Sequence, residues 1–176
     1  MSVQPILKMG HPMLAQVSQA VPQDQLGSPH LKTLVGNMLA TMQAVNGAGL
    51  AAVQIGIPLR VMIFGTTKNP RYPDAEPVPT TVLVNPTVTV VDPKPCEYFE
   101  GCLSVPGLRG PVMRPSTVRY EAVDVEGMPI VREATGFHAR VFQHEFDHLN
   151  GVLFPARVTD FARFGFTEEL ERGGLV

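Results

Sequence analysis

The chain has 176 residues, a formal net charge of −2 at pH 7 and a hydrophobic fraction of 44%. This length suits one compact domain over residues 1–176, and the composition is that of a folded protein rather than a disordered one. No block of lysine or arginine stands out, and no apolar run approaches the roughly 18 residues that cross a bilayer. We therefore expect neither a nucleic acid nor a membrane as a partner.

The cellular compartment is indicated by the N-terminal residues and the cysteines. The first residues lack the apolar core of a secretion signal and the arginine-rich character of a transit peptide. The two cysteines, Cys96 and Cys102, are too few for a disulfide scaffold and are wrongly spaced for a CxxC redox pair. We expect a protein of the reducing cytoplasm.

The first long element in chain order is a helix over residues 28–45. Ser28 can cap it, Pro29 suits its first position, and apolar residues then recur at helical spacing. Two apolar, β-like runs follow at 60–64 and 81–91. The 17 prolines and 16 glycines of the chain indicate many turns and short elements.

The second half of the chain alternates between loops and regular elements. A proline-rich loop is expected at 69–79, and 100–110 is interpreted as a turn-rich segment. Residues 117–125 alternate like a half-buried strand that turns into a partner strand at 129–134. A second helix is expected over 137–149.

A short amphipathic helix is expected around 160–171. Together the elements predict an α+β fold, in which short antiparallel or mixed β-sheets pack around the central helix 137–149, with a long helix near the N-terminus.

The motif His144-Glu145-x-x-His148 lies on the expected central helix. Residues four apart lie on one face of a helix, so the two imidazoles can bind one metal ion. Glu145 could take a proton from a metal-bound water, whose pKa the cation lowers to about 7, and pass it to a leaving amine. The pattern can also arise by chance, but the apolar neighbours indicate a buried helix, where two histidines and two acids need a reason.

A third protein ligand separates the enzyme classes that use this motif. Metzincins place their last histidine where this chain has Phe154. Thermolysin-like enzymes use a downstream acid, and Glu168 or Glu169 lies at a tolerable distance, in a segment typical of a solvated helix face. Cys102 is the better candidate, because a thiolate and two imidazoles leave the fourth tetrahedral position open.

Such a Cys-His-His set could hold Fe²⁺ or Zn²⁺, and the ligand types do not choose between them. Cys96, in contrast, is interpreted as an inert small hydrophobic side chain, the commoner role of a free cysteine.

The segment GAGLAA at 47–52 matches the letters of a dinucleotide-binding fingerprint. That fingerprint needs a strand before it and a helix after it, whereas here a helix precedes it, and Gly56 and Pro58 prevent a long helix from following. A bare backbone that lets an extended peptide approach is the better interpretation. Gln54 could donate from its amide to an oxyanion, although a lone glutamine is more often a surface or turn residue.

Three segments together make the chain resemble the peptide deformylase family. They are GAGLAAVQ at 47–54, EGCLS at 100–104 and QHEFDH at 143–148. The usual forms in the family are GxGLAAxQ, EGCLS and QHExDH, so all three match at their key positions and in the same order.

The resemblance implies removal of the N-formyl group from the initiator methionine of nascent bacterial or organellar polypeptides, with release of formate. It implies that Cys102, His144 and His148 bind one divalent metal ion, with Fe²⁺ expected in the cell and Zn²⁺, Ni²⁺ or Co²⁺ possible in preparations. It also implies that Glu145 is the general base and acid.

The resemblance implies roles for further residues. Gln54 and the backbone N–H of Leu103 would stabilise the oxyanion, and Glu100 and Arg114 would form a supporting ion pair. The residues implied in substrate binding are Gly47, Gly49 and Leu50 along the peptide backbone, Arg109 near the outer groove, and Val141 among the apolar side chains around the methionine.

The chain departs from the commonest bacterial pattern in two places. Arg140 stands where many members carry an aliphatic residue, and the loop at 69–79 is longer than in compact members. Both bear on pocket shape and peptide preference. Only Arg163 and Arg172 fall where some relatives carry a long basic helix that contacts the ribosome, so ribosome docking is not carried over.

The expected partners are N-formyl-methionyl peptides that emerge from the ribosome, and the expected state is a monomer or weak dimer in the bacterial cytoplasm. Two other functions remain as alternatives. One is a zincin-type endopeptidase, which would tolerate loss of Cys102. The other is a non-catalytic metal-binding relative that binds peptide N-termini.

Overall fold

The computed structural model of this chain describes residues 1–66 and 75–176. Within this part of the chain, the strands form one six-stranded sheet in the order β1-β2-β3-β4-β5, and β6 pairs with β4. All strand pairs are antiparallel. The expected α+β class with an antiparallel sheet is confirmed, although two strands are much longer than expected.

The elements have the following bounds. The strands are β1 (Gly49–Ala51), β2 (Val61–Thr66), β3 (Val78–Cys102), β4 (Val105–Val123), β5 (Pro129–Thr135) and β6 (Gly165–Phe166). The helices are α1 (Pro29–Ala44), α2 (Gly136–Leu149) and α3 (Thr167–Arg172), with 3-10 turns at Pro12–Ala15, Gln23–Gln25, Ala52–Ile55, Phe154–Arg157 and Phe161–Arg163. No helix in the described residues is long and apolar enough to span a bilayer.

Helix α1 corresponds to the helix expected over 28–45. The hydroxyl of Ser28 accepts a hydrogen bond from the backbone N–H of Leu31, and Pro29 occupies the first helical position. The apolar face of α1 packs against β1 and β2 in one hydrophobic cluster, in which Met38 is fully buried. This packing places the strand β1 beside the rest of the sheet.

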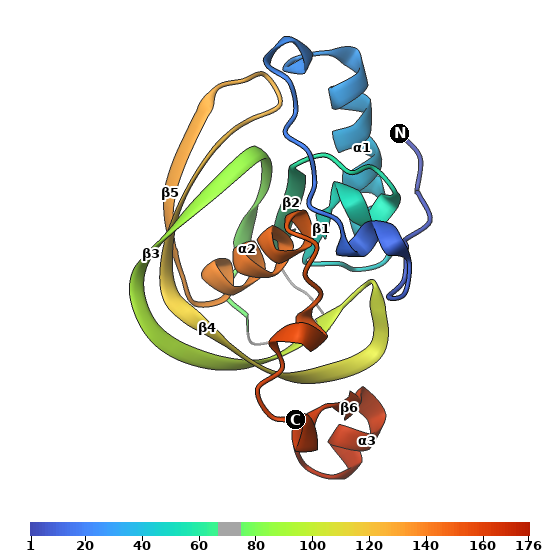
Figure 1. The fold of residues 1–176 in the computed structure, drawn as a ribbon, viewed down its shortest axis with the longest axis vertical. Helices are drawn as coiled ribbons and strands as arrows, with labels where there is room; N and C mark the ends of the chain where they lie inside the picture. The colour runs from blue at the N-terminus through green and yellow to red at the C-terminus, as the bar shows by residue number, and fades with distance from the viewer. Residues whose placement is uncertain (67–74) are drawn as a thin grey trace.

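Strands β3 and β4 form one long hairpin that curves around α2 (Figure 1). The turn-rich interpretation of 100–110 is wrong, because this segment is the closed end of the hairpin and its turn is only Leu103–Ser104. The prolines that suggested loops are accommodated by irregular pairing: Pro86 and Pro93 each fall within a shift of the β3–β4 register. The result is a bent, continuous pair of strands that ends at Cys102.

Helix α2 lies inside the curve of the sheet and covers the larger hydrophobic cluster (Figure 1). Phe142 on α2 stacks on Tyr120 of β4, with ring centroids 4.5 Å apart and planes 8° apart. Phe64 of β2 meets both rings edge to face at 6.3 Å. All three aromatic side chains are fully buried, so α2 is held against the sheet on this face.

Two other expectations concern less regular segments. The single helix expected at 160–171 is wrong: the 3-10 turn Phe161–Arg163 and β6 come before the short helix α3. Pairing of Phe166 with Leu108 of β4 supplies backbone hydrogen bonds that a continuous helix would not make with the sheet. Of the loop expected at 69–79, residues 69–74 lie outside the described residues, and Val78 and Pro79 belong to β3.

The C-terminus of α2 is closed by Gly151. The backbone N–H of Gly151 donates to the carbonyl of His148 at 3.2 Å, and that of Val152 donates to the carbonyl of Asp147 at 2.9 Å, which is the Schellman pattern. Gly151 has φ +72°, and an added Cβ would lie 2.6 Å from the carbonyl oxygen of Ala15. The position therefore requires glycine both for its backbone angle and for its neighbour.

Replacement of Gly151 by alanine should lower the free energy of unfolding by more than the roughly 1–2 kcal/mol that a left-handed backbone costs an L-residue. Gly56→Ala is the matched control, because Gly56 has φ +84° and open space around its Cβ position. Urea unfolding of both variants measures the difference. Equal losses would show that the contact with Ala15 imposes no constraint.

Candidate active site

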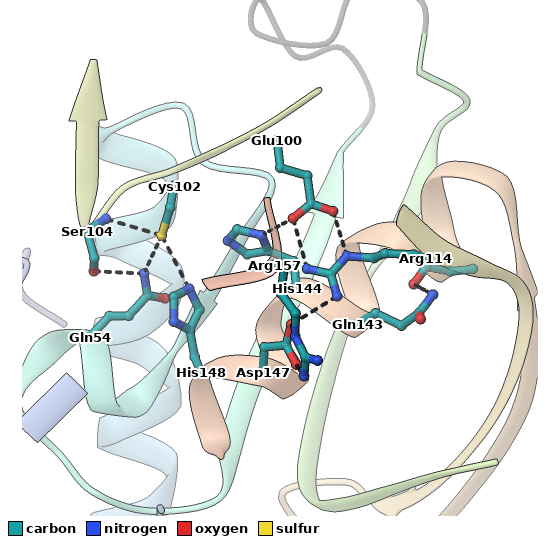
Figure 2. A network of polar contacts seen from close by, with 11 residues as sticks. Gln54, Glu100, Cys102, Ser104, Arg114, Gln143, His144, Asp147, His148 and Arg157 are labelled. Atoms are coloured by element: carbon teal, nitrogen blue, oxygen red, sulfur yellow. Dashed lines mark hydrogen bonds and ion pairs between the residues drawn. The ribbon is translucent and has the colours of Figure 1, made fainter. Parts of the chain in front are cut away.

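Three side chains that can bind a metal ion come together from two elements (Figure 2). Cys102 is the last residue of β3, and His144 and His148 lie about one turn apart on α2. One ligand atom from each residue lies within 4.8 Å of the others. The Cys102 Sγ atom is 3.3 Å from Nε2 of His148. The structure therefore brings together the three ligands expected from the sequence.

The chemistry of this group fits a divalent metal ion. Burial raises the pKa of the Cys102 thiol, but the charge of His148 and hydrogen bonds with both histidines outweigh it and hold the pKa well below its usual range. The thiolate is the form that binds metals. Within the described residues, Oε2 of Glu145 is buried without a hydrogen-bond partner, as expected beside a bound ion or water.

Glu145 lies next to the first histidine and is buried. Burial raises the pKa of its carboxyl group to about 7, against the lowering effect of His144 and His148. A carboxyl group with such a pKa can both accept and return a proton near neutral pH. Its carboxylate lies against Gly49 of β1, where an added Cβ would collide with it. The bare backbone at Gly49 thus provides the space that Glu145 occupies.

The side chain of Gln54 is fixed by its own backbone turn. Its Oε1 accepts a hydrogen bond from the N–H of Ala51 at 2.8 Å, so Nε2 is directed at the site. Nε2 donates to the Ser104 hydroxyl at 3.1 Å and lies 3.6 Å from the Cys102 sulfur (Figure 2). Gln54 is 1% exposed. It is therefore a buried hydrogen-bond donor and not the surface residue that a lone glutamine more often is.

A network of buried charges supports His144 from behind (Figure 2). Nδ1 of His144 is 2.9 Å from Oε2 of Glu100. Arg114 donates to both oxygens of Glu100, at 2.6 and 2.8 Å, and to Asp147 at 2.9 Å. Arg157 then donates to both oxygens of Asp147, at 2.8 and 3.3 Å. The ion pair expected between Glu100 and Arg114 is therefore present, within a longer chain of charges.

The charges of this network stabilise one another. Burial would raise the pKa of Glu100, but hydrogen bonds from Arg114 and His144 outweigh it and lower the pKa to about 2. Glu100 therefore stays ionised and accepts a hydrogen bond from the N–H at Nδ1 of His144. This leaves Nε2 of the same ring as the nitrogen that can bind a metal ion.

A pocket opens beside the three potential ligands. In addition to Cys102 and His144 it is lined by Gly49 of β1, Leu103 of the hairpin turn, and Phe137, Arg140 and Val141 of α2. The mixture of apolar side chains with a few polar groups is typical of a small-molecule or peptide-end site.

The substrate-binding residues implied by the resemblance do not all line this pocket. Gly49 and Val141 do, whereas Leu50 is fully buried in the cluster beneath α1. Gly47 precedes β1, and a Cβ there would lie 3.1 Å from the Leu103 side chain. Arg109 pairs with Gly165 in the β4–β6 ladder, outside the residues that line the pocket.

Arg140 occupies the pocket wall where an aliphatic residue is more usual. Its guanidinium carbon lies 4.6 Å from the ring centroid of Tyr98 and 4.8 Å from that of Phe137. Cation–π contacts on two rings hold the side chain against the wall.

The alternative third ligands lie elsewhere. Phe154, at the position of the metzincin histidine, is buried and stacks near His144 with ring centroids 6.4 Å apart. Glu168 and Glu169 are exposed on α3, and Glu169 pairs with Arg172. Neither acid belongs to the metal-binding group found in the described residues.

Sequence reasoning missed three polar residues of the site. Ser104 lies in the motif EGCLS and Asp147 in the motif QHEFDH, and nothing else in the sequence indicates that they belong to the site. Arg157 stands outside every motif. Its contact with Asp147 depends on the turn after α2, and nothing in the local sequence predicts it.

Loss of Arg114 should strongly destabilise the protein. Arg114→Met leaves Glu100 without its buried partner, and breaking a buried pair in this way costs about 3–5 kcal/mol. Arg119→Met is the matched control, because Arg119 pairs with Glu121 on the surface of β4, where a pair contributes about 0–1 kcal/mol. Chemical unfolding compares the two, and similar losses would contradict the role given to burial.

Nearly the whole chain is similar in sequence to known proteins. The family model described as polypeptide deformylase matches residues 3–164. A peptide deformylase 1 from Nitrosomonas europaea is 54% identical over 174 residues, which are 99% of this chain and 98% of that protein. A peptide deformylase 2 from Pseudomonas syringae pv. tomato is 54% identical over 163 residues, with 93% and 91% covered.

Solved structures agree with the sequence comparison. A class I type b peptide deformylase from Acinetobacter baumannii, crystallised with Met-Ala-Ser bound, has a TM-score of 0.87 and 42% identity, and the match covers 90% of this chain and 100% of that one. The peptide deformylase of Thermotoga maritima has a TM-score of 0.79 and 31% identity, with 91% and 100% covered. With the Cys102, His144 and His148 group in place, these matches show that the chain belongs to the polypeptide deformylase family.

Proposed function

We propose that this protein is a metal-dependent hydrolase that removes the N-formyl group from the N-terminal methionine of nascent polypeptides and releases formate. The observation that carries the proposal is the group of Cys102, His144 and His148, beside a pocket that Cys102, His144, Glu145 and Gln54 line, in a chain of the deformylase family.

Cys102, His144 and His148 would hold one divalent metal ion. A metal ion bound there would act as a Lewis acid, which lowers the pKa of water and polarises a carbonyl oxygen. The ligand set suits Fe²⁺ in the cell and Zn²⁺, Ni²⁺ or Co²⁺ in preparations. Glu100 contributes by fixing the ring of His144, as its hydrogen bond to Nδ1 indicates.

Glu145 is the proposed general base and acid. Its Oε2 atom is buried without a partner in the described residues, and its pKa of about 7 lies near neutral pH. Glu145 would take a proton from the attacking water and return it to the amine of methionine when the carbon–nitrogen bond breaks. The formyl carbon then leaves as formate.

Gln54 and the backbone N–H of Leu103 are the proposed donors to the oxygen that becomes negative during the reaction. Support for Gln54 comes from its fixed amide, whose Nε2 lies beside the Cys102 sulfur. Leu103 stands in the tight hairpin turn directly after Cys102 and lines the same pocket. The Gln54 amide is held without substrate, so little reorganisation of this proposed donor would be needed.

The substrate peptide is proposed to extend along the outer edge of β1, which among the described strands pairs only with β2. Gly47, Gly49 and Leu50 would offer their backbone, and Val141 would contact the methionine side chain. Arg109, beyond the pocket wall, would meet the outer part of the peptide. The Acinetobacter relative with Met-Ala-Ser bound supports a peptide ligand of this kind.

The same proposal includes the domain organisation, the cellular location, the oligomeric state and the partners of the enzyme. The 176 residues would form one catalytic domain that acts in the bacterial cytoplasm as a monomer or weak dimer. Its partners would be formyl-methionyl peptides that emerge from the ribosome, with no nucleic acid or membrane partner. An endopeptidase or a non-catalytic binder is less well supported, because the upstream ligand Cys102 and the complete pair of Glu145 and Gln54 fit deformylation.

Glu145→Gln should abolish the reaction without loss of metal. The amide cannot accept the proton from water, so formate release from formyl-Met-Ala-Ser should fall by about 10²–10⁴-fold. Metal content, measured by elemental analysis, should match the wild type because Glu145 is not one of the three ligands. Turnover at the wild-type rate would refute the proposed mechanism.

Gly49→Ala should impair catalysis more than folding. The new Cβ would collide with the Glu145 carboxylate, the end of a flexible side chain that can move aside, so the base leaves its position while the fold survives. We expect kcat to fall at least tenfold. Gly165→Ala is the control, because its Cβ would make an ordinary 3.8 Å contact with Leu170. Steady-state formate release and thermal unfolding separate the two effects; an unchanged kcat would contradict the assignment.

A further inference from the structure

The charge network behind His144 reaches the surface at one residue, Arg157. From the inside outward it runs from His144 to Glu100, Arg114, Asp147 and Arg157, with each link between 2.6 and 3.3 Å (Figure 2). The side chains of Glu100, Arg114 and Asp147 are 3%, 6% and 10% exposed, whereas that of Arg157 is 50% exposed. Arg157 is thus the outer end of a buried chain of alternating charges.

Arg157 balances the charge of the second of two buried carboxylates. Without it, the buried carboxylates of Glu100 and Asp147 would share the single guanidinium of Arg114. Because a buried charge without a partner is strongly unfavourable, Arg114 would then be drawn between the two acids. Arg157 supplies the second positive charge and donates hydrogen bonds to both oxygens of Asp147. Nε and Nη2 of Arg114 can then both donate to Glu100.

The position of Arg157 in the chain strengthens this link. It ends the 3-10 turn Phe154–Arg157, which follows α2 closely. The first residue of that turn, Phe154, is buried and packs against the ring of His144. One short turn therefore contacts His144 in two ways, directly through Phe154 and through the charge network from Arg157.

We propose that Arg157 is a positioning residue for the metal centre. By holding Asp147 it directs Arg114 at Glu100, and Glu100 in turn fixes the ring of His144 with Nε2 toward the metal. The inference rests on the proposed function for the metal centre and extends it to a residue outside the three motifs. Residues that orient metal ligands from behind typically change metal affinity or activity by about 10–100-fold when they are replaced.

Arg163 offers a matched comparison within the same chain. Its guanidinium also makes a bidentate pair, with Glu97 at 3.0 and 2.8 Å, and a further contact with Asp160. The side chains of these partners are 38% and 44% exposed, and within the described residues neither forms an ion pair with a metal-binding residue. Arg163→Met therefore removes a similar ion pair without touching the network.

The test uses protein loaded with Co²⁺, whose absorption spectrum reports the geometry of the ligands. Excess chelator is added, and the decay of the Co²⁺ absorption gives the rate of metal loss. Arg157→Met should lose Co²⁺ at least tenfold faster than the wild type and should lower kcat with little change in KM. Arg157→Lys keeps the charge but not the bidentate geometry, so its rate of Co²⁺ loss should lie between those of Arg157→Met and the wild type. Arg163→Met should match the wild type.

A double-mutant cycle shows whether Arg157 acts through Asp147. If it does, adding Arg157→Met to Asp147→Leu should not accelerate metal loss further, because the contact is already lost. If Arg157 only stabilises the fold, the two effects should multiply. Circular dichroism and urea unfolding establish that each variant is folded at the assay temperature, and a variant that unfolds is replaced by the milder Arg157→Gln.

The outcomes separate this inference from the proposed function. Wild-type protein that binds no Co²⁺ would overturn the metal centre and this inference together. Wild-type protein that binds Co²⁺ and releases formate, combined with unaltered metal loss in Arg157→Met, would overturn the inference alone. Equal acceleration in Arg157→Met and Arg163→Met, or in Arg157→Met and Arg157→Lys, would also overturn it.

Discussion

The guanidinium of Arg114 joins the two parts of the chain that must meet for the site to exist. It stands on β4 and is buried between Glu100 on β3 and Asp147 on α2. A buried ion pair is stable only while every partner stays in place, so the hairpin cannot slide along α2 without leaving a charge unpaired. The same contacts fix the end of β3, and therefore Cys102, relative to the two histidines.

The charges of the other site residues depend on the contacts of Arg114 with Glu100 and Asp147. The interior cation at Arg114 keeps Glu100 ionised, Glu100 fixes His144, and the histidines favour the thiolate of Cys102. Glu145 lies in the same interior without such a partner, and burial raises its pKa to about 7. Two carboxyl groups on neighbouring elements thus have opposite pKa shifts, because in the described part of the chain Glu100 contacts a guanidinium and Glu145 does not.

Parts of the fold and site could be predicted because their signals are local. Helical spacing and a cap at Ser28 indicate α1, and the four-residue spacing of His144 and His148 places both on one face of a helix. The length of the hairpin β3–β4 could not be predicted from local signals. Its prolines resemble loop signals in the sequence, yet shifts of register absorb them, and such shifts depend on a partner strand. Arg157 was missed for the same reason, since its partner is Asp147 on another element.

The sequence by itself determined the chemical inventory: a thiolate, two imidazoles, a carboxylate and an amide, in motifs that resemble one family. Short-range geometry and side-chain chemistry are sufficient for that conclusion. The tertiary structure alone decided that the Gln54 amide is directed at the site, that Gly49 makes room for Glu145, and that charges extend from His144 to the surface. Ala51 holds the Gln54 amide locally, but the contact of that amide with Ser104 and Cys102 joins residues far apart in the chain, as the other two features do. Only the tertiary packing brings such residues together.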